Sequence, residues 1–154
     1  MPGSLVVDLR EGYRKGARDL LEEGDLRALA RARVLSNGRR EQRAQELLGL
    51  VKLYRTGPRQ IWAPVLLDVL ASGLLARLRR LRIEPPFMDE EDLRQQLVAE
   101  LLEAAAGMPL PRYPVFLRRR LLDRANQRVR RSLARERRRQ ARQGSYELIT
   151  GPRP

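Results

Sequence analysis

The chain has 154 residues, of which 42% are hydrophobic and 33% are charged, and its formal net charge at pH 7 is +13. This length suits one compact domain with a substantial core and leaves little room for a second. Cysteine and histidine are both absent, which excludes disulfides, thiolate metal sites and histidine acid–base catalysis, so we expect no enzyme, no metal and no cofactor.

The N-terminal part predicts helices that precede the main domain. Apolar residues recur at helical spacing through residues 9–35, with a break at Gly24 and Asp25. The following Ser-Asn-Gly sequence is typical of a turn. We therefore expect an N-terminal helical extension over residues 1–37. Its short apolar start lacks the pattern of a signal peptide.

Two helices are predicted to open the main domain, which we place at residues 38–143. The first covers residues 39–55 and the second about residues 61–82, with Gly57 and Pro58 ending the first. The second helix is the most apolar segment of the chain. It is predicted to be the buried central element of the domain.

The same apolar segment is a poor candidate for a membrane span. Its longest apolar block, residues 63–76, is interrupted by Asp68 and followed at once by arginines. Such a block is too short and too charged to cross a bilayer. We expect a soluble, cytoplasmic protein.

An amphipathic helix follows a proline-containing break. Phe87 and Met88 are predicted to plug the connection, and Asp89 is the N-cap candidate of a helix that ends near Gly107. The four acids at residues 89–92 could hold a cation or act as an acid–base pair. Acids in a first turn also interact favourably with the helix dipole, and we interpret them in this structural way.

The last predicted helix is strongly basic. Twelve arginines and only two acids lie between Arg118 and Arg142, and apolar residues recur among them at steps of three and four. A face of one sign repels itself unless a polyanion or an acidic protein offsets the charge. We expect this helix to bind such a partner and its distal turns to project past the core. Residues 144–154 are predicted to form a flexible tail.

Two aromatic residues stand just before the basic segment. Tyr113 and Phe116 could stack on exposed bases, although core packing is the favoured interpretation of Phe116. The predicted nucleic-acid-binding residues are Tyr113, Phe116, Arg118, Arg119, Arg120, Arg124, Arg128, Arg131, Arg135, Arg138, Arg139 and Arg142.

No segment shows the period-two alternation or the hairpin dipeptides of strands. The predicted fold class is therefore all-α. We expect a compact bundle of about four core helices. A helical extension precedes it at the N-terminus, and the long basic helix follows at the C-terminus.

The order of these motifs resembles region 2 of bacterial RNA polymerase sigma factors. The motif Glu91-Asp92-Leu93-Arg94-Gln95-Gln96 opens the amphipathic helix, and Phe116-Leu117 leads the arginine-rich helix. In the extracytoplasmic-function group of that family, the first motif typically reads E-D-L-x-Q-E and an aromatic-Leu pair follows. The resemblance covers about residues 39–142.

The resemblance implies two partners, core RNA polymerase and promoter DNA. In the family, the helix with the acidic motif contacts a coiled coil on the polymerase clamp, and the next helix handles DNA around the minus-ten element. The polymerase contact would fall here to Glu91, Asp92, Arg94, Gln95 and Gln96, and the DNA contact to Tyr113, Phe116 and the arginines that follow. Gln96 replaces the usual acid, and the basic helix lacks the aromatic and polar set that captures flipped bases. We therefore expect it to hold a nucleic-acid backbone rather than to open a duplex.

Two other functions stay open at this point. One is a helical nucleic-acid-binding or assembly protein without polymerase contact, which would hold the phosphate backbone of DNA or RNA. The other is an interaction module for an acidic protein. None of the three functions requires a small-molecule substrate or a membrane.

Overall fold

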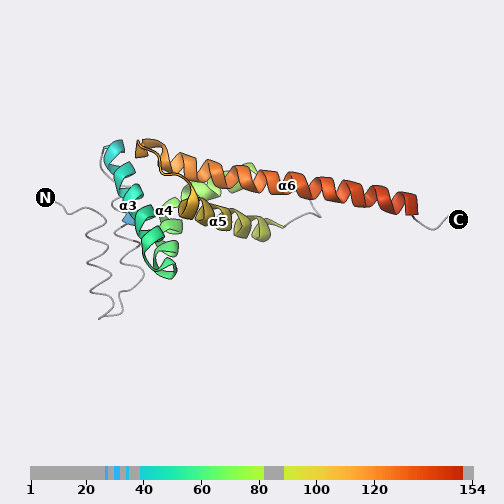
Figure 1. Ribbon diagram of the computed structural model, residues 1–154, viewed down its shortest axis with the longest axis horizontal. Helices are drawn as coiled ribbons and strands as arrows, with labels where there is room; N and C mark the ends of the chain where they lie inside the picture. Colours follow the sequence, from blue (N-terminus) through green and yellow to red (C-terminus); the bar gives the residue numbers. More distant parts are fainter. Residues whose placement is uncertain (1–26, 28–29, 32–33, 35–38, 82–88, 151–154) are drawn as a thin grey trace.

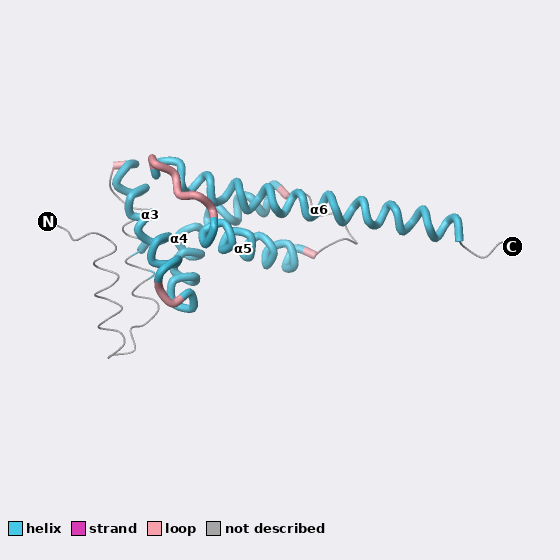
Figure 2. The backbone as a smooth tube through the Cα atoms, in the orientation of Figure 1, coloured by secondary structure: helices cyan, strands magenta, loops and turns pink. Residues whose placement is uncertain are grey.

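The computed structural model describes residues 27, 30, 31, 34, 39–81 and 89–150. Within these residues the structure has four α-helices, one short 3-10 helix and no strand, which confirms the all-α prediction. The elements are α3 (Arg40–Thr56), α4 (Arg59–Arg80), α5 (Glu90–Gly107), the 3-10 helix η1 (Pro114–Phe116) and α6 (Leu117–Thr150). Figure 2 shows short loops between consecutive helices wherever the connection is described.

Local sequence sets the starts of two helices. The Pro58 carbonyl accepts two amides of the first turn of α4, at 3.1 and 3.2 Å, so this helix begins at Arg59, two residues before the predicted start. The helix α5 begins directly after Asp89, whose carboxylate accepts the Asp92 amide at 2.7 Å. The predicted N-cap is therefore confirmed.

One apolar core lies among the four helices, and α4 contributes most to it. Val65, Leu66 and Val69 are completely buried, as expected for the central helix, whereas Leu75 is 45% exposed although the apolar pattern predicted it to be covered. The largest fully buried side chains are Trp62, Leu47, Leu50, Leu66, Leu70, Leu93, Leu97, Leu101, Leu117 and Leu121.

Among the described residues, α4 alone has the length and apolar composition that a membrane span requires. One face of α4 is buried against the other helices.

A part of the predicted N-terminal extension belongs to this core. Ala30 and Val34 are buried in the same apolar cluster as the residues of α3 and α4. Between them, the exposed guanidinium of Arg31 makes two hydrogen bonds to the carboxylate of Asp68 on α4. These hydrogen bonds, together with the carboxylate charge, raise the pKa of Arg31 above its ordinary value. The other predicted helical positions of the extension lie outside the described residues.

Close approaches fix how the helices pack. At the end of α3, Arg55 donates from Nε to the Ala105 carbonyl at 2.7 Å and from Nη2 to the Met108 carbonyl, which ties it to the end of α5. Where α4 crosses α6, Gly73 leaves room for Leu122, because a Cβ at residue 73 would lie 2.4 Å from Leu122 Cδ1.

The long helix α6 differs from its prediction at the C-terminal end. It continues to Thr150, so the tail predicted to start at residue 144 is wrong for residues 144–150. A single glycine such as Gly144 disfavours a helix by only about 1 kcal/mol and does not end it. Residues 151–154 and the predicted plug of Phe87 and Met88 lie outside the described residues.

Candidate nucleic-acid interface

The helix α6 has a docked half and a projecting half. Leu117, Leu121, Leu122, Ala125 and Val129 are buried in the core. Farther along the helix no described side chain is buried. Leu133, the next residue of the apolar period, is partly buried against the core. Figure 1 shows α6 continuing well past the Glu90 end of α5, with no other described helix beside its distal part. The predicted projection of its distal turns is confirmed.

Seven arginines form a continuous row along one side of α6, which we name the arginine stripe. Their spacing of three and four residues keeps them on one side of a helix with 3.6 residues per turn. Its members are Arg120, Arg124, Arg128, Arg131, Arg135, Arg138 and Arg142. At about 1.5 Å per residue, the stripe extends over roughly 33 Å. All of its members were among the predicted nucleic-acid-binding residues.

The stripe is largely free of neutralising carboxylates. Arg128 is half-buried and pairs with Glu100 of α5 at 3.4 Å. The six other members are exposed, and none forms an ion pair with a residue that the structure describes. A row of six unpaired guanidinium groups is a strong attraction for a polyanion.

The two acids of this segment lie away from the stripe. Asp123 accepts a hydrogen bond from Arg77 of α4 at 2.9 Å and lies 3.5 Å from Arg119. Glu136 pairs with Arg139 at 3.7 Å. The predicted site residues Arg119 and Arg139 are therefore partly neutralised, and neither belongs to the stripe.

The aromatic residues before α6 face outward. Tyr113 is 72% exposed and Phe116 is 50% exposed, so the expectation that Phe116 packs in the core is wrong. Phe116 is the last residue of η1, and the guanidinium of Arg40 lies over its ring, 5.5 Å from the centroid. An exposed ring with a cation on one face leaves an area on which a planar group can stack.

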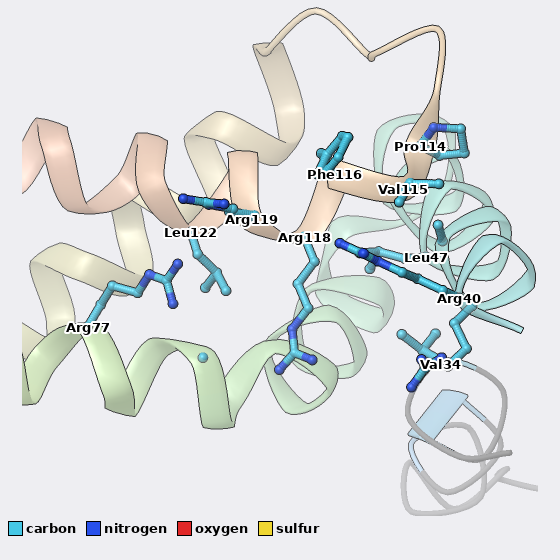
Figure 3. Close-up of a pocket in the computed structure, with 13 residues that line it drawn as sticks. Val34, Arg40, Leu47, Arg77, Pro114, Val115, Phe116, Arg118, Arg119 and Leu122 are labelled. Atoms are coloured by element: carbon cyan, nitrogen blue, oxygen red, sulfur yellow. The ribbon is translucent and has the colours of Figure 1, made fainter. Parts of the chain in front are cut away.

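A second basic surface, which the sequence did not predict, lies on the other flank of α6. A cavity of about 410 Å³ opens between α3, α4, η1 and the start of α6. Among the described residues its wall contains no carboxylate and five arginines: Arg40, Arg43, Arg77, Arg118 and Arg119. Figure 3 shows Arg40, Arg77 and Arg118 around this space, each on a different helix. We name it the five-arginine cavity.

Two predicted nucleic-acid-binding arginines, Arg118 and Arg119, line this cavity instead of the stripe, and Arg118 is the more buried of the two. It is half-buried, and its Nη2 donates to Ser72 Oγ of α4 at 2.9 Å. This bond holds the guanidinium in the five-arginine cavity. Arg40, Arg43 and Arg77 were missed because they come from two other helices, and no local pattern marks them as neighbours.

The predicted polymerase-binding residues lie at the start of α5. Glu91, Asp92, Arg94 and Gln95 are exposed, whereas Gln96 is half-buried and its Oε1 has no hydrogen-bond partner among the described atoms. Arg94 lies 3.6 Å from Glu91, and Gln95 donates to Glu91 at 3.4 Å. Four of the five predicted residues are thus available to a partner. The described residues hold no group of three or more acidic, histidine or cysteine side chains that could bind a metal.

Comparisons with protein-family models, curated proteins and solved structures give no match to this chain. The function proposed below therefore rests on the position, exposure and pairing of the charged side chains.

Proposed function

We propose that this protein binds nucleic acid through the arginine stripe of α6. The observation that carries the proposal is the row of six exposed arginines without an ion pair among the described residues. Guanidinium groups fork onto phosphate oxygens, and backbone contacts of this kind supply most of the affinity of non-specific nucleic-acid binding.

The dimensions of α6 favour duplex DNA as the nucleic acid. An α-helix with side chains is about 10–12 Å wide, and the major groove of B-form DNA is about 12 Å wide. The part of the stripe on the projecting half, from Arg131 to Arg142, extends over roughly 17 Å, which is about half a turn of the duplex. Among the described residues, no helix packs against the projecting half of α6 in a way that would collide with the groove walls. The deep, narrow major groove of duplex RNA does not admit a helix in this way.

A salt titration of DNA binding tests this proposal with a matched pair of variants. The stripe variant carries Arg135→Ala and Arg142→Ala, and the control carries Arg130→Ala and Arg137→Ala. All four side chains are exposed, and each pair is seven residues apart, so both variants lose the same charge from the same helix. If all six unpaired arginines contact phosphate, the slope of log K against log salt is about −5 for duplex DNA.

We expect the stripe variant to reduce that slope by about 2 and the control to change it by less than about 0.5. Equal reductions of the slope in the two variants would show that only the total charge of α6 matters, and would contradict binding through the arginine stripe. Repeating the titration with single-stranded DNA and duplex RNA ranks the three nucleic acids under the same conditions.

A second component of the proposal is contact with core RNA polymerase, as in the sigma factors whose region 2 the sequence resembles. It is favoured by the exposure of Glu91, Asp92, Arg94 and Gln95 at the free end of a helix that is otherwise buried on one face. Together with the stripe, this gives a transcription protein with polymerase on one helix and DNA on the next.

Retention of core polymerase on immobilised protein tests the second component. Asp92→Arg reverses an exposed charge and leaves the N-cap carboxylate of Asp89 in place. We expect wild-type protein to retain polymerase and this variant to lose at least about 80% of it. Equal retention by both proteins, or by neither, would remove polymerase from the proposal and leave DNA binding intact.

A further inference from the structure

The five-arginine cavity has an excess of positive charge that its own residues do not offset. Asp123 is the shared partner of Arg77 and Arg119. Arg40, Arg43 and Arg118 form no ion pair within the described part of the chain. Guanidinium groups brought together from three helices repel one another, and a bound anion removes that repulsion.

The start of α6 adds to this positive potential. Arg118 and Arg119 lie in its first turn, directly after η1, whose Pro114 carbonyl accepts the Leu117 amide. The start of α3 is close by, since Arg40 lies over Phe116. The positive ends of two helix dipoles are therefore near the same group of arginines.

The cavity also has an apolar side. Val34, Leu47 and Leu122 line it together with Gly73, which presents no side chain. Phe116 stands at its edge with half of its surface exposed. Inorganic phosphate would use only the arginines, whereas a ligand with a flat ring would use the apolar wall and the Phe116 ring as well.

The size of the cavity restricts the ligand further. Its volume of about 410 Å³ lies within the range of roughly 300–1,000 Å³ that is typical of small-molecule sites. It is too small for a duplex or a folded partner to enter. The required ligand is small, carries several negative charges and has a planar ring.

We propose that the five-arginine cavity binds a nucleoside polyphosphate, with its phosphates against Arg43, Arg77 and Arg118 and its base against Phe116. The site is separate from the arginine stripe, because the cavity opens on the α4 flank of α6 and the stripe runs on the flank where Arg128 meets Glu100 of α5. The proposal therefore stands or falls independently of nucleic-acid binding by α6.

Calorimetric titration of the full chain with adenosine triphosphate, inorganic tripolyphosphate and adenosine tests the site. We expect the triphosphate to bind about tenfold more tightly than tripolyphosphate, because only it can stack on Phe116, and adenosine to bind more weakly than both. Equal affinities for adenosine triphosphate and tripolyphosphate would overturn the nucleoside part of the proposal.

Two variants locate the binding. Arg43→Gln with Arg118→Gln removes both charges and keeps shorter polar side chains, and we expect at least about a tenfold loss of affinity for adenosine triphosphate. Phe116→Leu keeps an apolar group, and we expect it to lower the affinity for adenosine triphosphate to that for tripolyphosphate while leaving the latter unchanged. Unaltered binding in the double variant would overturn the proposed site.

The stripe variant with Arg135→Ala and Arg142→Ala is the control that separates the two surfaces. We expect it to bind adenosine triphosphate as tightly as the wild type. The variant with Arg43→Gln and Arg118→Gln is expected to keep the wild-type slope of log K against log salt on duplex DNA. If each variant loses both ligands, the chain has one diffuse basic surface and the proposal fails.

Two competitors define the source of the ligand. The same 5′-polyphosphate is found on free nucleotides and at the 5′ end of an RNA strand. A 5′-triphosphorylated trinucleotide that binds more weakly than adenosine triphosphate supports a free nucleotide, and tighter binding supports a strand end. A phosphorylated peptide that displaces adenosine triphosphate at a lower concentration than either would overturn the assignment.

Discussion

Gly73 and Gly144 occupy opposite kinds of position in the helices that contain them. A Cβ at Gly73 would lie 2.4 Å from Cδ1 of Leu122, a side chain that is only 3% exposed. Apart from its two chain neighbours and the backbone of its own helix, a Cβ at Gly144 would meet no atom within 4 Å. The same residue type therefore allows close helix packing at one place and only weakens a helix at the other.

Alanine at these two positions is expected to change stability in opposite directions. Gly73→Ala forces Leu122 out of its position, and we expect the free energy of unfolding to fall by about 1–3 kcal/mol. Gly144→Ala removes backbone freedom from an exposed helical turn, and we expect a rise of up to about 1 kcal/mol. Urea unfolding with a common m-value measures both changes. A stabilised Gly73→Ala protein would show that the α4–α6 contact is looser than described.

Single residues also mark where sequence-based prediction stopped. Phe116 is of a residue type that is usually found in the core, yet it faces outward beside Arg40. Pro114 and Leu117 on either side of it are buried, and their packing sets the direction of the Phe116 side chain. Likewise Arg118 belongs to the basic run in the sequence, whereas its bond to Ser72 directs it into the cavity. Hydrophobic type alone does not fix the direction of a side chain near a helix start.

At the scale of elements, apolar periodicity predicted the helices well because each one buries a single stripe. The positions of Leu117, Leu121 and Val129 in α6 follow this period and are all buried. The end of α6 was missed because an exposed helix needs no apolar stripe, so its last turns leave no periodic signal. The five-arginine cavity was missed for another reason: it depends on which helices become neighbours.

The N-cap of α5 provides a test of one helix start. Asp89→Ala removes the acceptor of the Asp92 amide, and we expect a loss of about 1 kcal/mol in the free energy of unfolding. Asp92→Ala is the matched control, because Asp92 contributes its backbone amide and not its side chain to the cap. We expect that control to cost no more than about 0.5 kcal/mol. Thermal unfolding of both variants at the same pH gives the comparison.

The projecting half of α6 can be removed in two steps. A chain that ends at residue 143 keeps the whole arginine stripe, and we expect its stability and its salt slope on duplex DNA to match the wild type. A chain that ends at residue 133 loses Arg135, Arg138 and Arg142, and we expect the slope to fall by about 3.

No residue buried in the core lies beyond position 133 among those described, so both truncated proteins should remain folded. Circular dichroism at several temperatures verifies this before the titrations. A full loss of DNA binding in the longer of the two would show that contacts beyond the stripe, such as the exposed Tyr146 and Ile149, dominate.

At the scale of the whole molecule, the segment before α3 is joined to the core in two ways. Ala30 and Val34 contribute buried apolar surface, and Arg31 binds Asp68 from outside. The apolar contacts hold the segment, since an exposed ion pair contributes only about 0–1 kcal/mol. The domain boundary predicted after residue 37 thus separates residues that share one core.

Asp68→Asn is expected to affect this segment more than the whole fold. The substitution removes the charge that pairs with Arg31, and we expect faster amide hydrogen exchange at residues 30 and 34 with little change in the temperature of global unfolding. Arg94→Gln, which breaks only the exposed pairs with Glu90 and Glu91 on α5, is the control and should leave that exchange unchanged. Global unfolding at a clearly lower temperature would mean that the Arg31 pair supports the entire core.

The half-docked position of α6 gives it the mechanics of a lever arm. The docked turns are the fulcrum. Among the described side chains of α6, Val129 is the last that is fully buried, and about 32 Å of helix extends from there to Thr150. A tilt of about 5° at the fulcrum would displace the tip by roughly 3 Å, which approaches the rise of one base pair. Small changes of packing deep inside the bundle would therefore shift the alignment of the distal arginines on a bound strand without touching that strand.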